Sequence, residues 1–249
     1  MKKIFIFLIL TIQLMAVVVH KPVLTLNKDS SIATINIDRI DLGLSGFIVQ
    51  KISKSHTTIL KNAVVIDFDE EKKIATLKLT KFTEGVNSAL PTGDWSVKIG
   101  DMAILGIGYS RALLIAPEED IYYRISKNIK VQWLHPDIFT AILSLNGHPT
   151  PLKEDFDDMV KSSSIGIIFI YINQKLYTID AKSFVILNIS DAPLKQKKIM
   201  LPFYSRVKEI EANWWGEGSD KINNYESYYL KLLKKYNSKN ENLEIKDEK

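Results

Sequence analysis

The sequence contains no cysteine, and this absence removes several kinds of chemistry at once. Without cysteine there can be no disulfide, no thiolate metal ligand, no cysteine nucleophile and no lipid-modified cysteine anchor. Long apolar runs are also missing after the first twenty residues; residues 165–172 are apolar but too few to cross a bilayer. The 249 residues must therefore hold their fold together by packing alone.

Arginine and histidine are scarce. Only four of the 33 basic residues are Arg, so the sequence does not indicate planar, bidentate recognition of phosphate. The formal net charge is +4, or 33 − 2 − 29 = +2 without Lys2 and Lys3, which is too small to indicate a nucleic-acid partner. None of the four histidines lies three or four positions from another, as a helical two-histidine metal site requires. His135 and His148 each precede proline, where an extended or capping role explains them.

Catalytic motifs are missing as well. There is no Gly-x-Ser-x-Gly turn and no phosphate-binding loop, and Gly106-Ile107-Gly108 lacks a third glycine. The acidic residues of 67–71 lie in a predicted hairpin turn. Asp155, Asp157 and Asp158 are predicted to be solvated charges on the outer face of a helix. We therefore predict that the protein is not an enzyme and has no catalytic residue, no metal site and no cofactor.

The first residues have the layout of a signal peptide. A basic start at Lys2 and Lys3 is followed by an apolar stretch and by small-residue Ala16. We predict that residues 1–16 are a signal peptide and that the protein is exported to the periplasm, the outer membrane or the cell surface. An uncleaved anchor is the alternative, but the apolar stretch is shorter than the roughly 20 residues that a span needs. No transmembrane span is expected after cleavage.

A β-rich domain is predicted over residues 30–108. Alternating or short apolar segments recur at 34–38, 46–49, 63–68, 74–79 and 97–105, separated by turn residues. The charged run at 69–73 between two apolar segments indicates a hairpin. Short strands at this spacing are typical of a small barrel or sandwich.

An α/β layer domain is predicted over residues 109–200, with the order β-α-β-α-α-β-β. Strands are expected at 112–115 and 131–134, and a closing hairpin at 165–172 and 175–187. The helices between them begin at prolines, which suit the first helical position. The residues predicted to face inward are Ile121, Ile125 and Ile129 in the first helix; Ile138, Ala141, Ile142 and Leu145 in the second; and Leu152, Phe156, Met159 and Val160 in the third.

An aromatic helical segment is predicted over residues 201–236 and a disordered polar tail over 237–249. The helix carries a stripe of large side chains: Tyr225, Tyr228, Tyr229, Leu232 and Tyr236. Trp214 and Trp215 have two possible roles. They could form an aromatic binding face, but we favour the interpretation that they pack the terminal helix onto the body. The predicted fold class is thus α+β, with a small barrel-like domain, an α/β domain, and a C-terminal helix with a disordered tail.

Several stretches carry a resemblance to a known family: residues 45–49, 56–59, 89–91, 109–117, 133–137, 154–156 and 180–184. In their order and spacing, over about residues 30–190, they resemble the N-terminal domain of bacterial plasminogen-binding surface proteins. The strings Arg-Ala-Leu-Leu-Ile-Ala-Pro and His-Pro-Asp, at 111–117 and 135–137, are the most specific of them.

The resemblance implies an exported, surface-associated protein that captures host plasminogen. It also implies a role for a C-terminal lysine, because a plasminogen kringle has an anionic, aromatic-lined slot for one ammonium and one carboxylate. Lys249, with Lys246 nearby, is the candidate ligand. This chain departs from longer relatives because its tail is short and acidic residues precede Lys249. The alternative function is a structural or assembly component of a periplasmic or outer-membrane machine, with an envelope protein as partner.

Overall fold

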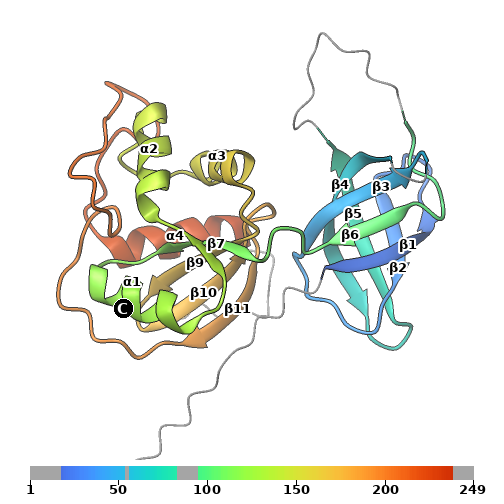
Figure 1. Cartoon of the computed structure of the whole chain (residues 1–249), viewed down its shortest axis with the longest axis horizontal. Coiled ribbons are helices and arrows are strands. Elements are labelled where there is room, and N and C mark those ends of the chain that lie inside the picture. The colour runs from blue at the N-terminus through green and yellow to red at the C-terminus, as the bar shows by residue number, and fades with distance from the viewer. Residues whose placement is uncertain (1–17, 54–55, 83–94, 238–249) are drawn as a thin grey trace, which may run out of the picture.

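The computed structural model describes residues 18–53, 56–82 and 95–237, and these form two domains side by side (Figure 1). The predicted signal peptide lies outside the described residues, and so does residue 238 onward. The first domain is all β, and the second is a mixed sheet with helices, as the sequence predicts. The α+β class is therefore confirmed.

Six antiparallel strands close the first domain into a barrel, in the order β1-β2-β5-β4-β3-β6. Their bounds are β1 Val19–Leu26, β2 Ile32–Asn36, β3 Ser45–Lys51, β4 Thr57–Asp69, β5 Ile74–Lys81 and β6 Met102–Leu105. The predicted hairpin is present, since β4 and β5 pair in antiparallel across the charged turn. Alternate side chains fill the barrel; Ile35, Ile48 and Leu77 are fully buried there.

The strand β1 precedes residue 30, where the sequence places the start of the β-rich domain. It closes the barrel because it pairs with both β2 and β6. The sequence hides this strand, since Pro22 interrupts it and only Val23 among its residues is buried. The strand is specified by its two neighbours rather than by its own pattern.

Five strands form the sheet of the second domain, in the order β11-β10-β9-β7-β8. Their bounds are β7 Arg111–Ile115, β8 Gln132–Leu134, β9 Ile167–Ile172, β10 Lys175–Asp180 and β11 Ile186–Asp191. The strand β7 runs parallel to both of its neighbours, β8 and β9, while β9, β10 and β11 form an antiparallel meander. The predicted hairpin is confirmed for β9 and β10, but residues 175–187 belong to two strands, because the chain turns between Asp180 and Ile186.

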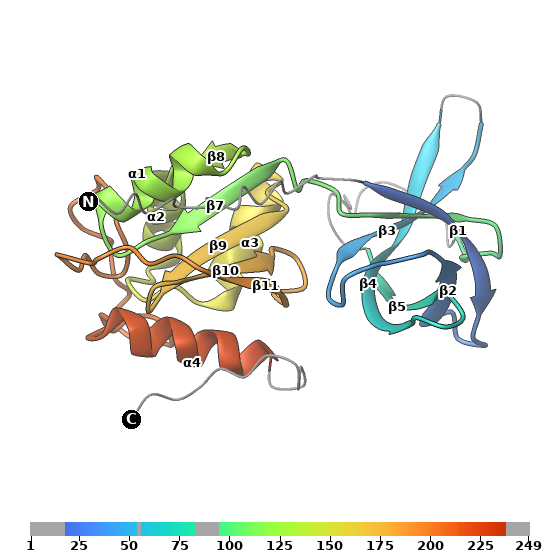
Figure 2. The same cartoon turned by 90° about the horizontal axis from the view of Figure 1, so that it is seen from below.

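Helices cover both faces of this sheet (Figure 2). They are α1 Glu119–Asn128, α2 Pro136–Asn146, α3 Lys153–Ser163 and α4 Tyr225–Asn237. Because side chains alternate along a strand, Leu114 faces α1 and Leu113 faces the layer of α2, α3 and α4. The predicted start at proline is confirmed for α2, whose first residue is Pro136, whereas α1 and α3 each begin two residues after their proline, Pro117 and Pro151.

The predicted orientation of α2 is wrong. Its buried residues are Pro136, Phe139, Thr140 and Leu143, whereas three of the four predicted inward residues are exposed and Ile142 is only partly buried. Both faces of this helix are apolar, so the period of its apolar residues does not choose between them. Phe139 decides the matter, because its ring packs against Phe156 and Phe203 with centroids 4.6 and 5.6 Å away.

A buried carboxylate joins the two domains. Asp180, which is fully buried at the end of β10, accepts hydrogen bonds from the Tyr109 hydroxyl at 2.6 Å and from the backbone N–H of Ser45 at 2.9 Å. Its other oxygen accepts from the backbone N–H groups of Lys182 and Ser183 at 3.0 and 2.7 Å. Burial and the Asp180 charge raise the pKa of Tyr109, so its hydroxyl stays a donor. The barrel, the linker and the β10–β11 turn therefore meet at one charge.

Removing this carboxylate should destabilise the whole protein. We expect Asp180→Ala to lower the free energy of unfolding by about 3 kcal/mol, because it leaves buried donors without an acceptor. Tyr109→Phe, which removes a single donor, should cost about 1–2 kcal/mol. Urea unfolding measures both. Asp191→Ala, at an exposed position of the same sheet, is the control, with an expected change below about 0.5 kcal/mol. An Asp180→Ala variant as stable as this control would contradict the prediction.

Candidate functional site

The predicted ligand residues Lys246 and Lys249 lie outside the described residues. The structure does show where the C-terminal segment begins. Asn237, the last residue of α4, is buried; its side chain accepts from the backbone N–H of Ile186 at 2.8 Å and donates to the carbonyls of Phe184 and Leu233 at 3.2 and 2.9 Å. The residues that follow α4 therefore start from a fixed point beside β11.

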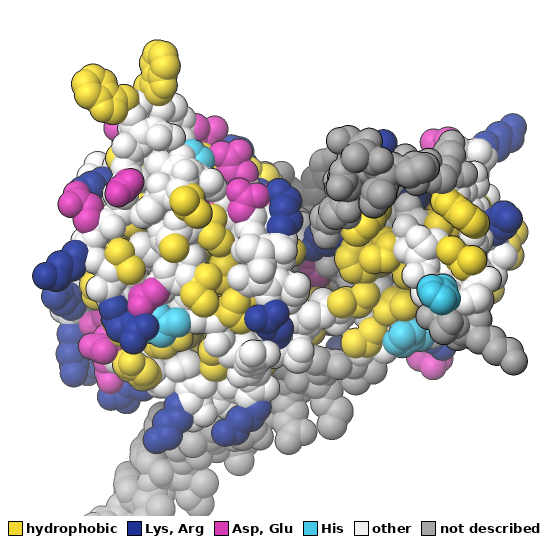
Figure 3. All heavy atoms as spheres, turned by 45° about the horizontal axis from the view of Figure 1, so that its top comes forward, with side chains coloured by type: hydrophobic (Ala, Val, Ile, Leu, Met, Phe, Trp, Pro, Cys, Tyr) yellow, Lys and Arg dark blue, Asp and Glu magenta, His cyan; other side chains and the backbone are white. Residues whose placement is uncertain are grey.

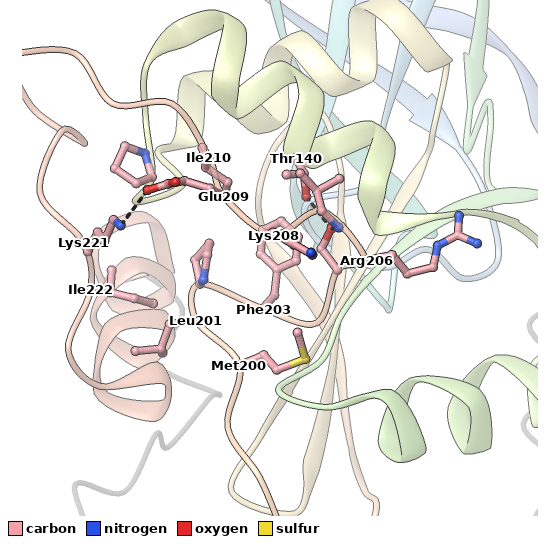
Figure 4. A pocket seen from close by; sticks show the side chains of 14 residues that line it. Thr140, Met200, Leu201, Phe203, Arg206, Lys208, Glu209, Ile210, Lys221 and Ile222 are labelled. Carbon is pink, nitrogen blue, oxygen red and sulfur yellow. Dashed lines mark hydrogen bonds and ion pairs between the residues drawn. The ribbon is translucent and has the colours of Figure 1, made fainter.

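A cavity of about 350 Å³ lies between α2 and the segment that leads from β11 to α4 (Figure 4). The segment is held in place at the N-terminus of α1, where the carboxylate of Glu118 accepts from the backbone N–H groups of Lys197 and Lys198 at 3.1 and 2.8 Å. The cavity walls are mainly apolar: Pro149, Met200, Leu201, Pro202, Phe203, Val207, Ile210 and Ile222. The sequence does not reveal this cavity, because its walls come largely from an irregular segment without a periodic pattern.

Several polar groups at and beside the cavity are hydrogen-bonded to one another. Thr140 donates its hydroxyl to Ser205 at 3.0 Å, and Ser205 donates to Asp137 at 2.9 Å. Arg206 donates its Nε to the same carboxylate at 2.7 Å. Burial works to raise the pKa of Asp137, but the hydrogen bonds from Arg206 outweigh it and lower that pKa. At the rim, Lys221 lies 3.4 Å from Glu209.

The two histidines that precede a proline, His135 and His148, have structural roles in the helices next to them. His135 caps α2, since its Nδ1 accepts from the backbone N–H of Asp137 at 3.2 Å, as the sequence predicts. His148 is mostly buried, and its Nδ1 lies 2.9 Å from Asp155. Within residues 18–53, 56–82 and 95–237 no group of three or more His, Asp or Glu side chains could hold a metal ion.

The prediction that Asp155, Asp157 and Asp158 are all surface charges is wrong for Asp155. This side chain is fully buried; it accepts from Asn146 at 2.8 Å and from the backbone N–H of Leu152 at 2.6 Å. It therefore ties the start of α3 to the end of α2. Asp157 and Asp158 are partly exposed and pair with Lys153 and Lys161. The position of Asp155, three residues after the N-cap residue Leu152, is the capping-box position and was the signal for its role.

The two tryptophans do not pack the terminal helix onto the body. Trp214 is 103% exposed and Trp215 is 87% exposed, so the favoured interpretation of this pair is wrong. The tyrosine stripe of α4 does pack: Tyr225 and Tyr229 are fully buried, and their hydroxyls donate to the carbonyls of Ile115 and Pro202. The helix is thus held by its own aromatic residues.

The barrel, the mixed sheet and the apolar cavity define the class of this protein. It is a two-domain α+β protein with a mainly apolar cavity in its second domain. The family is more specific: the chain belongs to the family described as plasminogen-binding protein pgbA N-terminal, whose sequence model matches residues 18–233. This match confirms the resemblance found in the sequence and covers both domains and α4 up to Leu233.

Curated relatives agree with the family. The chain is 29% identical over 209 residues to the plasminogen-binding protein PgbA of Helicobacter pylori strain J99, covering 82% of this chain and 45% of that protein. It is 28% identical over 200 residues to PgbA of strain 26695, covering 79% of this chain and 43% of that protein. The chain thus spans less than half the length of these relatives. No solved structure matches the chain.

The buried aspartate of α3 allows a matched test of its role. We expect Asp155→Ala to lower the free energy of unfolding by about 2–4 kcal/mol, because Leu152 and Asn146 lose a buried acceptor. Asp157→Ala, on the same helix, should cost less than about 1 kcal/mol, as is usual for a partly exposed ion pair. Thermal and urea unfolding of the two variants measure the difference. Equal losses would show that Asp155 has no structural role of its own.

Proposed function

We propose that this chain is an exported envelope protein of the plasminogen-binding type. The observation that supports the proposal is the family match over residues 18–233, together with two curated relatives whose names state plasminogen binding. The proposed ligand is host plasminogen, and the proposed place of action is the periplasm, the outer membrane or the cell surface. No helix among the described residues is long and apolar enough to cross a membrane.

Lysine is the proposed ligand group. A C-terminal lysine carries an ammonium and a carboxylate on one residue, and this is the pair that an anionic, aromatic-lined kringle slot receives. Lys249 meets this requirement, and Lys246 is a second source of an ammonium group. The C-terminal end of α4 supports the proposal, because hydrogen bonds of Asn237 fix the point from which the segment with both lysines begins.

A second candidate function has its own observation. A structural or assembly component of an envelope machine would present a surface to partner subunits, and the exposed Trp214 and Trp215 are such a surface. This candidate needs no enzyme chemistry either. The two functions differ in where a partner binds: at the C-terminal lysines in the first, and on the folded body in the second.

Deleting Lys249 tests the plasminogen function. The deletion leaves Glu248 at the end, which keeps a carboxylate, supplies no ammonium and adds negative charge toward an anionic slot. We expect affinity for immobilised plasminogen to fall roughly ten- to hundredfold, the effect of one charge-assisted pair on the order of 1.5–3 kcal/mol. A free lysine analogue should compete to a similar extent. Surface-binding titration of the mature protein measures both effects.

The matched control is Lys195→Ala, which removes an exposed lysine from the folded body and should leave affinity unchanged. Equal binding by the wild type and the deletion would move the site to internal lysines, with Lys246→Ala as the next variant. No saturable binding by the intact protein at micromolar concentration would refute the proposed function.

Surface exposure is tested on intact cells. If the protein meets host plasminogen, an external protease should remove it from unbroken cells. Loss of the protein from lysed cells alone would place it behind the outer membrane. That result would favour the assembly function over the plasminogen function.

A further inference from the structure

Large apolar side chains stand exposed at one end of the second domain. Among the exposed large apolar side chains of the described residues, Trp214, Trp215 and Leu145 have the highest exposures, at 103%, 87% and 86%. The outward face of α2 continues this surface with side chains at helical spacing. We call it the apolar ridge, defined as Ile138, Ala141, Ile142, Leu145, Trp214 and Trp215. An exposed apolar surface of this kind marks an interaction site.

The loop of residues 213–218, which we call the tryptophan loop, is hydrogen-bonded at both of its ends to the last residues of α2 and to the segment that follows α2. Before the tryptophans, Asn213 donates its backbone N–H to the carbonyl of Gly147 at 2.9 Å and its side-chain amide to the carbonyl of Asn146 at 2.8 Å. After them, the backbone N–H of Thr150 donates to the carbonyl of Gly218 at 3.1 Å. A Cβ on Gly147 would lie 2.2 Å from the Asn213 side chain, so the close approach needs glycine. The loop that carries the two indoles is therefore held by hydrogen bonds on both sides of the tryptophans.

The charge distribution and shape of the ridge indicate its partner. None of its six residues carries a formal charge, and the one charged residue of α2, Asp137, is paired with Arg206 away from the tip. The acidic Glu211 and Glu217 border the loop, Glu217 lies 3.7 Å from Lys235, and the ridge itself has no basic residue to attract anionic phosphates. Apolar side chains project outward at this edge of the molecule (Figure 3). A convex, uncharged surface led by indoles suits the deformable headgroup layer of a bilayer, where Trp places an apolar ring and a polar N–H.

We infer that the apolar ridge is a membrane-contact surface, which inserts Trp214, Trp215 and Leu145 into the headgroup region of a phospholipid bilayer. The protein would lie on the membrane by this edge. The barrel and the C-terminal end of α4 are not part of the ridge, so they stay available for other contacts. The inference does not depend on plasminogen binding.

Partition of the mature protein into vesicles tests the inference. With phosphatidylcholine vesicles at millimolar lipid, we expect co-flotation of the protein and a blue shift of tryptophan emission. The double variant Trp214→Ala/Trp215→Ala should lower the partition coefficient tenfold or more, because two large apolar side chains lose their burial. Raising the salt concentration should change wild-type partition less than twofold, since the ridge is uncharged.

The matched control is Ile99→Ser, which removes an exposed apolar side chain, 69% exposed, from the barrel. It should partition like the wild type. Three outcomes would overturn the inference: no partition of the wild type, equal partition of the double variant, or binding that disappears at high salt. A wild-type dimer in sedimentation that the double variant converts to monomer would assign the ridge to a second copy of the chain instead. Circular dichroism and urea unfolding confirm that each variant is folded.

Discussion

The Asp180 carboxylate is the constraint on which the relation of the two domains depends. A buried carboxylate is stable only when hydrogen-bond donors replace the lost water. Three parts of the chain donate to Asp180: Ser45 of the barrel, Tyr109 of the linker and the turn at 182–183. The same turn supplies the carbonyl of Phe184 to Asn237, the last residue of α4. The domain junction and the C-terminal end of α4 are therefore parts of one hydrogen-bonded unit.

This arrangement separates the surfaces that the proposals use. The C-terminal lysines follow a helix whose end is fixed at the β10–β11 turn, whereas the tryptophan loop is fastened at the end of α2. The cavity lies beside the segment that leads from β11 to α4. The proposed plasminogen capture and the proposed membrane contact therefore rest on different parts of the chain.

The fold was largely predictable, and the failures have physical causes. The barrel hairpin at 69–73 and the start of α2 at Pro136 were predictable, because turn and capping chemistry is local. Strand β1 was missed, because its strand character comes from pairing with β2 and β6. The orientation of α2 was wrong, because both of its faces are apolar and a third element, Phe203, selects one. The cavity was not predictable, because its walls come from residues far apart in sequence.

The sequence by itself determined the family, the α+β class, the succession of a β domain and an α/β domain, and the candidate lysines, since these depend on local patterns and on motif order. The tertiary structure decided which charges and aromatic side chains are buried. Asp155 and Asp157 lie on the same helix, yet only the first finds buried donors around it. Tyr229 and Trp214 lie in the same aromatic segment, yet one is buried and the other is exposed. Burial depends on contacts between distant segments, which composition and spacing do not specify.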